Sequence, residues 1–211
     1  MKAQAYYPAF INLSRKNCVV VGGGKVAERK VSSLLRSGAN VVVISPEITA
    51  NLRKYKEKGK IKHVERNYKK GDLKNAFFVI AATSDEKTNN QVSRDAPFLV
   101  NVVDRPEMAN FIVPSIVNRG PMTIAISTSG ASPAISKTVR KELEILYNKD
   151  FGDFLCFLMQ MRKKLIGEVK DSKKRERLLK EFGSKEIFSI LRNKGFEAAK
   201  NKVLEMIKQI C

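Results

Sequence analysis

The segment Gly22-Gly23-Gly24-Lys25-Val26-Ala27 is the first place in the chain where residue types and spacing indicate chemistry. It fits the pattern G-x-G-x-x-A, in which the first glycine permits a tight turn and the second lets a phosphate approach the backbone. The small Ala27 allows a helix to pack closely on a strand. Free amides at the start of that helix would then face the phosphates. We therefore predict a dinucleotide-binding loop made by Gly22, Gly23, Gly24, Lys25 and Val26.

Asp104 is the residue best suited to moving a proton. It follows the apolar run 98–103, and ligands of parallel sheets bind at the carboxyl ends of the strands. A carboxylate there could accept a proton from a bound substrate. The alternative is a turn aspartate ahead of Arg105-Pro106. His63 is the only histidine, and none of the three cysteines has a partner at metal-ligand spacing, which argues against a zinc site or a Ser-His-Asp triad.

Two further polar segments follow predicted strands. Ser45 stands where an acidic residue is expected to bind the ribose, so it could bond a ribose hydroxyl or merely cap the next helix. The fingerprint therefore does not decide between NAD and NADP. The loop 127–133 leads into a helix with Ser132 as N-cap and Pro133 in the first turn. An anion could bind its amides and hydroxyls, or the loop could be only a capped helix start; its candidate residues are Ser127, Thr128, Ser129 and Ser132.

The elements that must position these residues alternate between short apolar runs and helical patterns. This alternation is typical of an α/β fold with a doubly wound parallel sheet. The expected strands are 18–21, 41–44, 61–64, 77–83 and 98–103, and the expected helices are 25–37, 47–58 and 85–94. An apolar stretch at 110–117 precedes one more strand at 122–128. The helix that begins at Pro133 carries Ile135, Val139, Leu143 and Leu146 on one face, and beyond Tyr147 we expect short, charged helices.

Composition narrows the class of protein. The chain has 211 residues and a net charge of +19, which favours a polyanionic partner: nucleic acid, an anionic membrane, or a small molecule rich in carboxylates or phosphates. No apolar run approaches the roughly 20 residues of a membrane span, and the first residues do not resemble a signal peptide. An odd number of cysteines makes a poor disulfide framework. We therefore expect a cytoplasmic protein without a membrane partner.

Three strings carry a resemblance to a known family: GGGKVAERK, AATSDEKTNNQV and VNVVDRPEMANFIVPSIVNRGPMTIAISTSGASPAISKTVRKELE. They are similar to the precorrin-2 dehydrogenases of the siroheme synthase family, from about Tyr7 to Leu146. The resemblance implies NAD-dependent oxidation of precorrin-2 to sirohydrochlorin and, in some members, insertion of Fe2+. It also implies an NAD-binding Rossmann domain at 1–113, a dimerisation unit at 114–149, a helical C-terminal domain at 150–211, and a homodimer.

The resemblance also assigns roles to residues. Asp104 matches the family's catalytic aspartate, and Thr128 stands where some longer members have a phosphorylatable serine. The cofactor contacts it implies are Gly22, Gly24, Lys25, Val26, Ser45, Pro46, Glu47 and Thr83. The substrate is a polycarboxylate, so a basic protein attracts it, and Arg105, Arg119 and the run 162–164 could contact it. No resident metal is implied.

A competing interpretation is an NAD(H)-sensing regulator that binds DNA. Such a protein needs a recognition element such as a winged helix, and the roughly 16 residues ahead of the first strand are too few for one. The charges of the helical tail are mixed, as in DSKKRERLLKEF, and lack interleaved aromatic residues. We therefore expect no nucleic-acid partner.

Overall fold

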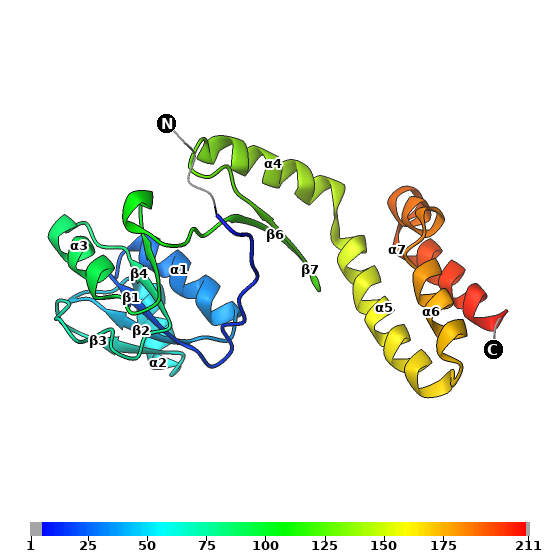
Figure 1. Cartoon of the computed structure of the whole chain (residues 1–211), viewed down its shortest axis with the longest axis horizontal. Helices are drawn as coiled ribbons and strands as arrows, with labels where there is room; N and C mark the ends of the chain where they lie inside the picture. Colours follow the sequence, from blue (N-terminus) through cyan, green and yellow to red (C-terminus); the bar gives the residue numbers. More distant parts are fainter. Residues whose placement is uncertain (1–5, 210–211) are drawn as a thin grey trace. The chain divides into compact units, whose positions relative to one another are not determined.

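The computed structural model describes residues 6–209, and the chain divides into two compact units, Met1–Val113 and Pro114–Cys211 (Figure 1). The first unit contains a five-stranded sheet in the order β3-β2-β1-β4-β5, and every pairing in it is parallel. Its strands are β1 (Asn17–Val21), β2 (Asn40–Ile44), β3 (Ile61–Val64), β4 (Phe78–Ala81) and β5 (Leu99–Val102). The predicted α/β class with a parallel sheet is confirmed.

Helices cover both faces of this sheet because its strands are apolar on both sides. The side chains of α1 (Lys25–Arg36) and α2 (Ala50–Glu57) join one core cluster, through Val31 and Leu52. Val92 of α3 (Glu86–Asp95) joins a second cluster on the other face. Figure 1 shows α1 and α3 on opposite sides of the sheet. The strand order reverses between β1 and β4, so the edge beside these two strands is where such folds bind ligands.

The boundaries differ from the sequence-based expectation at one functional place. The second helix begins at Ala50 and not at Glu47, because the Thr49 hydroxyl caps it by accepting the Leu52 N–H at 3.3 Å. Residues 45–48 are therefore irregular backbone beside the glycine loop. The β3–β4 connection is an irregular loop buried through Leu73 and Ala76, and a short 3-10 turn, η1 (Pro106–Met108), follows β5.

The second unit begins with a hairpin. β6 (Ser115–Arg119) pairs antiparallel with β7 (Met122–Ile126) across a turn at Gly120-Pro121, so the end of the apolar stretch 110–117 is a strand. The helix α4 (Pro133–Leu146) follows. Val117 is buried, whereas Ile135 and Leu146 of α4 are exposed.

The remaining helices are α5 (Lys149–Glu168), α6 (Ser172–Glu181) and α7 (Lys185–Lys208), which is interrupted at Gly195, where φ is +79°. The expectation of short, charged helices is wrong for α5, which has 20 residues. Its buried Phe151, Phe154 and Phe157 form the centre of a core shared with α6 and α7. Within residues 6–209 no helix is long and apolar enough to cross a membrane.

Candidate functional site

A cavity of about 1000 Å³ lies at the carboxyl edge of the sheet in the first unit. It is bounded by the glycine loop, by the segments after β2 and β4, and by the end of β5. All nine predicted cofactor contacts and the predicted proton acceptor line it: Gly22, Gly23, Gly24, Lys25, Val26, Ser45, Pro46, Glu47, Thr83 and Asp104. The fold therefore brings together residues that are up to 82 positions apart in the sequence (22 to 104).

The three consecutive glycines meet different requirements. Gly22 has φ of +119°, and a Cβ there would lie 2.4 Å from the Ala82 carbonyl oxygen. A Cβ on Gly23 would lie 1.9 Å from the carbonyl oxygen of Glu47. Both glycines thus let backbone pack against backbone. A Cβ on Gly24 would meet nothing within 4 Å, so this residue faces the open cavity.

Helix α1 has no side-chain cap. Its N-cap is Gly24, so no side chain satisfies the first amides of the helix. In the described part of the chain, every other α-helix has an N-cap side chain that accepts a backbone N–H: Thr49, Asp85, Ser132, Asn148, Asp171 and Ser184. Uncapped amides and the positive end of the helix dipole suit an anion such as a pyrophosphate. The residues present fit a dinucleotide.

Ser45 is buried at the end of β2 and does not cap α2, because Thr49 does. This resolves one of the two roles left open for Ser45. Its carbonyl oxygen lies 2.9 Å from Nε2 of His63, which fixes the backbone there. Glu47 is exposed, two residues further along the cavity wall. A serine hydroxyl and a carboxylate at this place are groups that can bond ribose hydroxyls.

Thr83, after β4, is held by the buried side chain of Asn89. The Asn89 amide donates to the Thr83 carbonyl at 3.0 Å, and its Oδ1 accepts from the Thr83 hydroxyl at 2.9 Å. The neighbouring Asp85 caps α3, and hydrogen bonding from the Thr88 hydroxyl, then from the amides of Thr88 and Lys87, holds the Asp85 pKa below its usual value. The sequence analysis did not single out Asn89. The only sequence feature that marks it is an asparagine in the first turn of a helix that follows a strand.

Asp104 follows β5 in a left-handed conformation, with φ of +61°. It is one of three non-glycine residues with positive φ in the described chain; the others are Arg15 and Ser129. Strained backbone of this kind collects at functional sites. The Asp104 carboxylate is exposed and caps nothing, because within residues 6–209 it makes no hydrogen bond or salt bridge. The following Arg105 is bound instead to Glu86 at 2.7 Å and to Glu107 at 3.6 Å.

The β3–β4 loop adds two residues to the cavity wall that the sequence did not indicate. Asn67 and Tyr68 line the cavity, and the Tyr68 hydroxyl donates to Asp95 at 2.8 Å. Burial, followed by that carboxylate, raises the pKa of Tyr68. Arg66 makes two hydrogen bonds of 2.8 Å to Asp72 and so fixes the loop. No periodic apolar pattern marks this segment, so its role could not be predicted.

The loop 127–132 of the second unit satisfies its own polar groups. The Thr128 hydroxyl accepts the Ser132 N–H at 3.2 Å, and the Ser132 hydroxyl accepts the Ile135 N–H at 3.2 Å. The Ser127 hydroxyl accepts the Ser129 N–H at 3.0 Å. Ser129 itself has φ of +51°. The four predicted residues are therefore neighbours, but the hydroxyls of Ser127, Thr128 and Ser132 already accept backbone N–H groups.

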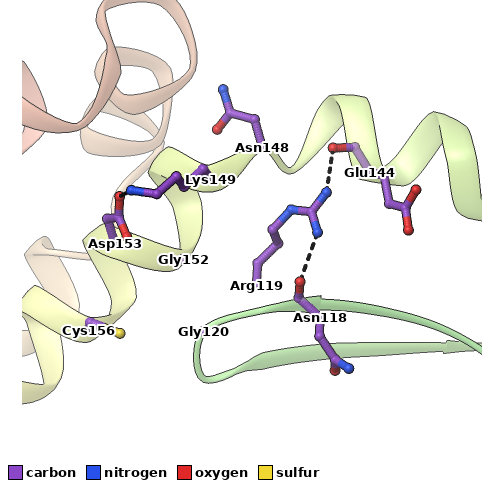
Figure 2. Close-up of a pocket in the computed structure, with 9 residues that line it drawn as sticks. All are labelled: Asn118, Arg119, Gly120, Glu144, Asn148, Lys149, Gly152, Asp153 and Cys156. Atoms are coloured by element: carbon purple, nitrogen blue, oxygen red, sulfur yellow. Dashed lines mark hydrogen bonds and ion pairs between the residues drawn. The ribbon is translucent and has the colours of Figure 1, made fainter. Parts of the chain in front are cut away.

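Arg119 also has a structural task. Its guanidinium donates to the carbonyl oxygens of Tyr147 at 2.7 Å, Glu144 at 2.9 Å and Asn118 at 2.8 Å. Figure 2 shows it between the hairpin and the end of α4, beside a cavity of about 380 Å³. It thus satisfies carbonyls that the helix end leaves free. The arginine that we expected near the substrate binds the backbone of its own unit.

Together, the parallel sheet, the glycine loop and the uncapped α1 define a Rossmann-type dinucleotide-binding domain. A family model described as "Putative NAD(P)-binding" matches residues 9–115, and one described as "Sirohaem biosynthesis protein central" matches residues 119–145. The chain belongs to the family of siroheme synthases and precorrin-2 dehydrogenases.

The relatives support this assignment over different lengths. The chain is 38% identical to "Precorrin-2 dehydrogenase" of Bacillus subtilis over 74% of this chain and 98% of that protein. It is 42% identical to "Siroheme synthase" of Methylobacillus flagellatus, over 74% of this chain but only 34% of that protein. The chain thus spans about a third of the siroheme synthases it matches. A solved structure, "SirC, precorrin-2 dehydrogenase", has a TM-score of 0.80 at 26% identity and covers 97% of this chain and 100% of its own.

Proposed function

We propose that this chain oxidises precorrin-2 to sirohydrochlorin with NAD as the cofactor. The observation that carries the proposal is one cavity holding both an uncapped helix N-terminus and an unpaired carboxylate, Asp104. The helix N-terminus can bind the phosphates of the cofactor, and the carboxylate can accept a proton from the substrate. The likeness to the Bacillus subtilis precorrin-2 dehydrogenase over nearly its full length supplies the substrate.

The cofactor side of the cavity would be bound mainly by backbone. The amides of Gly24, Lys25 and Val26 would hold the pyrophosphate, and Gly24 leaves the space for it. Ser45, Pro46 and Glu47 would bind the ribose next to β2, and Thr83 would line the site after β4. When bound, NAD supplies the hydride acceptor.

Asp104 would accept the proton that the hydride leaves behind. Oxidation of precorrin-2 removes a hydride and a proton, and the cofactor takes only the hydride. A carboxylate free of internal hydrogen bonds keeps its lone pairs available for that proton. The backbone turns directly after β5, where the Arg105 N–H donates to the Val102 carbonyl at 3.3 Å, and the left-handed Asp104 within this turn presents its carboxylate at the end of the strand.

The substrate's carboxylates would meet the basic surface of a chain with net charge +19. We propose Arg105 and the loop residues Ser127, Thr128, Ser129 and Ser132 as contacts. Arg105 would exchange its exposed partners Glu86 and Glu107 for a substrate carboxylate, since exposed ion pairs are weak. Ser129 is the loop residue whose hydroxyl makes no hydrogen bond within the described chain.

The substitution Asp104→Asn tests the proton acceptor. The amide keeps the size of the side chain but loses its basicity, so the dehydrogenation rate should fall about 100-fold or more. NAD binding and thermal stability should stay near those of the parent protein, because Asp104 caps no helix and bonds no neighbour. The measurement is NAD-dependent turnover of precorrin-2, with a melting curve on the same preparation. Near-normal turnover would rule out this role.

We also propose that Fe2+ is a second substrate. Metal insertion requires pyrrole protons to leave, and the same carboxylate could accept them. Within residues 6–209 no group of three or more His, Cys, Asp or Glu residues could hold a resident metal ion. Adding Fe2+ to the sirohydrochlorin product, and following its absorption, tests this step. Spontaneous insertion measured without protein is the control.

A homodimer is the assembly that we propose. Ile135, Ile145 and Leu146 of α4 are exposed, Ile145 by 80%, and the two-stranded sheet has unpaired edges within the described residues. A unit this small gains stability by burying such a face against a second copy. Sedimentation should give a dimer at micromolar concentration, and Ile145→Glu should shift it toward monomer. A monomeric parent protein would contradict the proposal.

A further inference from the structure

Glu28 is a largely buried carboxylate in the first turn of α1 that the function described so far does not use. Its side chain is 16% exposed, and its Oε2 atom is buried without a hydrogen-bond partner within residues 6–209. Taking a carboxylate oxygen out of water without giving it a donor costs folding free energy. Glu28 does not line the dinucleotide cavity. Stability alone therefore does not account for a charged side chain at this place.

The hydrogen bond that Glu28 does make crosses to the next helix. Its Oε1 atom accepts from Nδ2 of Asn51 at 2.8 Å, and Asn51 lies in the first turn of α2. This bond is the main cause that holds the pKa of Glu28 below its usual value, so the carboxyl is ionised at neutral pH. Hydrogen bonds to ionised groups are stronger than those between neutral ones. A charge-assisted hydrogen bond thus links the first turns of α1 and α2.

The segment 45–49, which contains the proposed ribose contacts, leads directly into α2. It has neither helix nor strand structure, so its position depends on a few individual contacts. The Ser45 carbonyl oxygen accepts from Nε2 of His63 at 2.9 Å, and the Thr49 N–H donates to the Gly23 carbonyl at 3.1 Å. The link between the two helices lies just beyond the second of these bonds and fixes the end of the segment to α1.

We propose that Glu28 is a positioning residue for cofactor binding. Through Asn51 it would hold the segment 45–49 in the place where Ser45 and Glu47 meet the adenosine ribose of NAD. This inference rests on the proposed function, which puts the ribose at this segment. Glu28 would touch neither the cofactor nor the substrate, and it would take no part in proton transfer.

The variants separate this hydrogen bond from the charge of Glu28, because Nζ of Lys25, which lines the cavity, lies 3.7 Å from the same carboxylate. Asn51→Ala and Glu28→Leu both remove the bond, and we expect each to weaken NAD binding about 10-fold in calorimetric titration. Glu28→Gln keeps an oxygen that can accept from Asn51 but removes the charge, so its NAD affinity should stay within about 3-fold of the parent value.

The matched control is Lys54→Ala, on the same helix as Asn51. Both residues are exposed, so both variants should fold, but the Lys54 side chain makes no hydrogen bond or salt bridge in the described part of the chain. Lys54→Ala should bind NAD like the parent protein. In turnover, Asn51→Ala should raise KM for NAD about 10-fold and leave kcat and KM for precorrin-2 little changed.

An NAD analogue that lacks the 2′-hydroxyl of the adenosine ribose tests the place of action. The parent protein should bind this analogue about 10-fold more weakly than NAD, because a ribose contact is lost. Asn51→Ala and Glu28→Leu should bind the two ligands with similar affinity, since the displaced segment no longer contacts that hydroxyl. A purely structural role would lower the melting temperature without changing this ratio of affinities.

Four results would overturn the inference. The first is a lower melting temperature with unchanged NAD affinity in Asn51→Ala and Glu28→Leu. The second is an equal loss of affinity for both ligands, and the third is a parent protein that binds both equally. The fourth is a large effect in Glu28→Gln with none in Asn51→Ala, because Glu28 would then act through its charge. A parent protein that binds NAD but does not oxidise precorrin-2 would contradict only the proposed function, since binding alone tests the role of Glu28.

Discussion

The N-termini of α1 and α4 follow loops of small residues, and both loops were candidates for anion binding. At α1 the N-cap is Gly24, which has no side chain to offer the helix amides. At α4 the N-cap is Ser132, whose hydroxyl accepts the Ile135 N–H, while Thr128 accepts the Ser132 N–H. The first helix thus keeps its amides for a ligand, and the second satisfies its own.

This difference separates two uses of the same helix geometry. A side-chain cap stabilises the folded chain by about 1 kcal/mol relative to alanine but by only about a few tenths of a kcal/mol relative to glycine, so omitting the cap at Gly24 costs little stability. The chain accepts that cost at α1, where the amides border a cavity of about 1000 Å³. At α4 the capped amide is not available to a substrate, so any contact must come from other groups of the loop. The hydroxyl of Ser129 is such a group, because it makes no hydrogen bond within the described chain.

The largest expected effect comes from capping α1 with a carboxylate. In Gly24→Asp the new side chain meets no protein atom and is a favourable N-cap, so the chain should fold with equal or slightly greater stability. The carboxylate would occupy the place of the pyrophosphate and repel it, and we expect NAD affinity to fall about 100-fold or more. Calorimetric titration with NAD measures this.

Two neighbouring variants are controls for Gly24→Asp. Gly24→Ala adds no charge and should lower NAD affinity far less. Gly23→Ala should instead lower the stability of the protein, because its Cβ would lie 1.9 Å from the Glu47 carbonyl oxygen. Unchanged NAD affinity in a folded Gly24→Asp protein would show that the N-terminus of α1 does not bind the pyrophosphate.

Removing the cap of α4 should have a smaller effect of a different kind. Ser132→Ala leaves the Ile135 N–H without its acceptor and should cost about 1 kcal/mol of stability, or roughly 2–4 °C in melting temperature. NAD affinity should not change. Ser129→Ala, which removes a hydroxyl that caps nothing, is the matched control. Equal melting temperatures for Ser132→Ala and the parent would mean that α4 does not depend on this cap.

The smallest effect distinguishes a carboxylate cap from a hydroxyl cap. Hydrogen bonds hold the pKa of Asp85 below its usual value, so its cap of α3 contributes stability above the unfolded pKa of about 3.9 and loses it as pH falls through the folded pKa. The amide signals of Lys87 and Thr88 should therefore titrate at acid pH in NMR spectra. The Ile135 amide, capped by a hydroxyl, should not follow that titration; a shared midpoint would indicate general acid unfolding instead.

Much of the first unit could be predicted from the sequence because its signals are local. Strands are predicted by the apolar runs at 18–21 and 41–44, and a turn is predicted by the glycine loop. Neither prediction needs information from distant residues. Asp104 could be placed at the sheet edge because every parallel strand ends there. The requirement at Gly23 could not be foreseen, since it depends on contact with Glu47, 24 residues away in the sequence (23 to 47).

Tertiary partners explain what the sequence did not reveal. Arg105 and Arg119 were both expected near the substrate, but Arg119 binds three backbone carbonyls and Arg105 binds the two exposed carboxylates of Glu86 and Glu107. The length of α5 was underestimated because the packing of its phenylalanines against α6 and α7, which stabilises the long helix, is not visible in the sequence. The partners of each arginine include groups that lie far away in the sequence, and a single sequence does not contain that information.

The strand order of the first unit has a consequence for the time course of folding. Its central pairing joins Cys18 with Phe78, so the chain must close a loop of 60 residues (18 to 78) before that ladder can form. The hairpin of the second unit joins Arg119 with Met122, a local contact that forms on the microsecond timescale. Pairings distant in sequence slow folding, because loop-closure entropy is lost before contacts compensate for it. We therefore expect the nucleotide cavity, which is built on β1 and β4, to form after the hairpin.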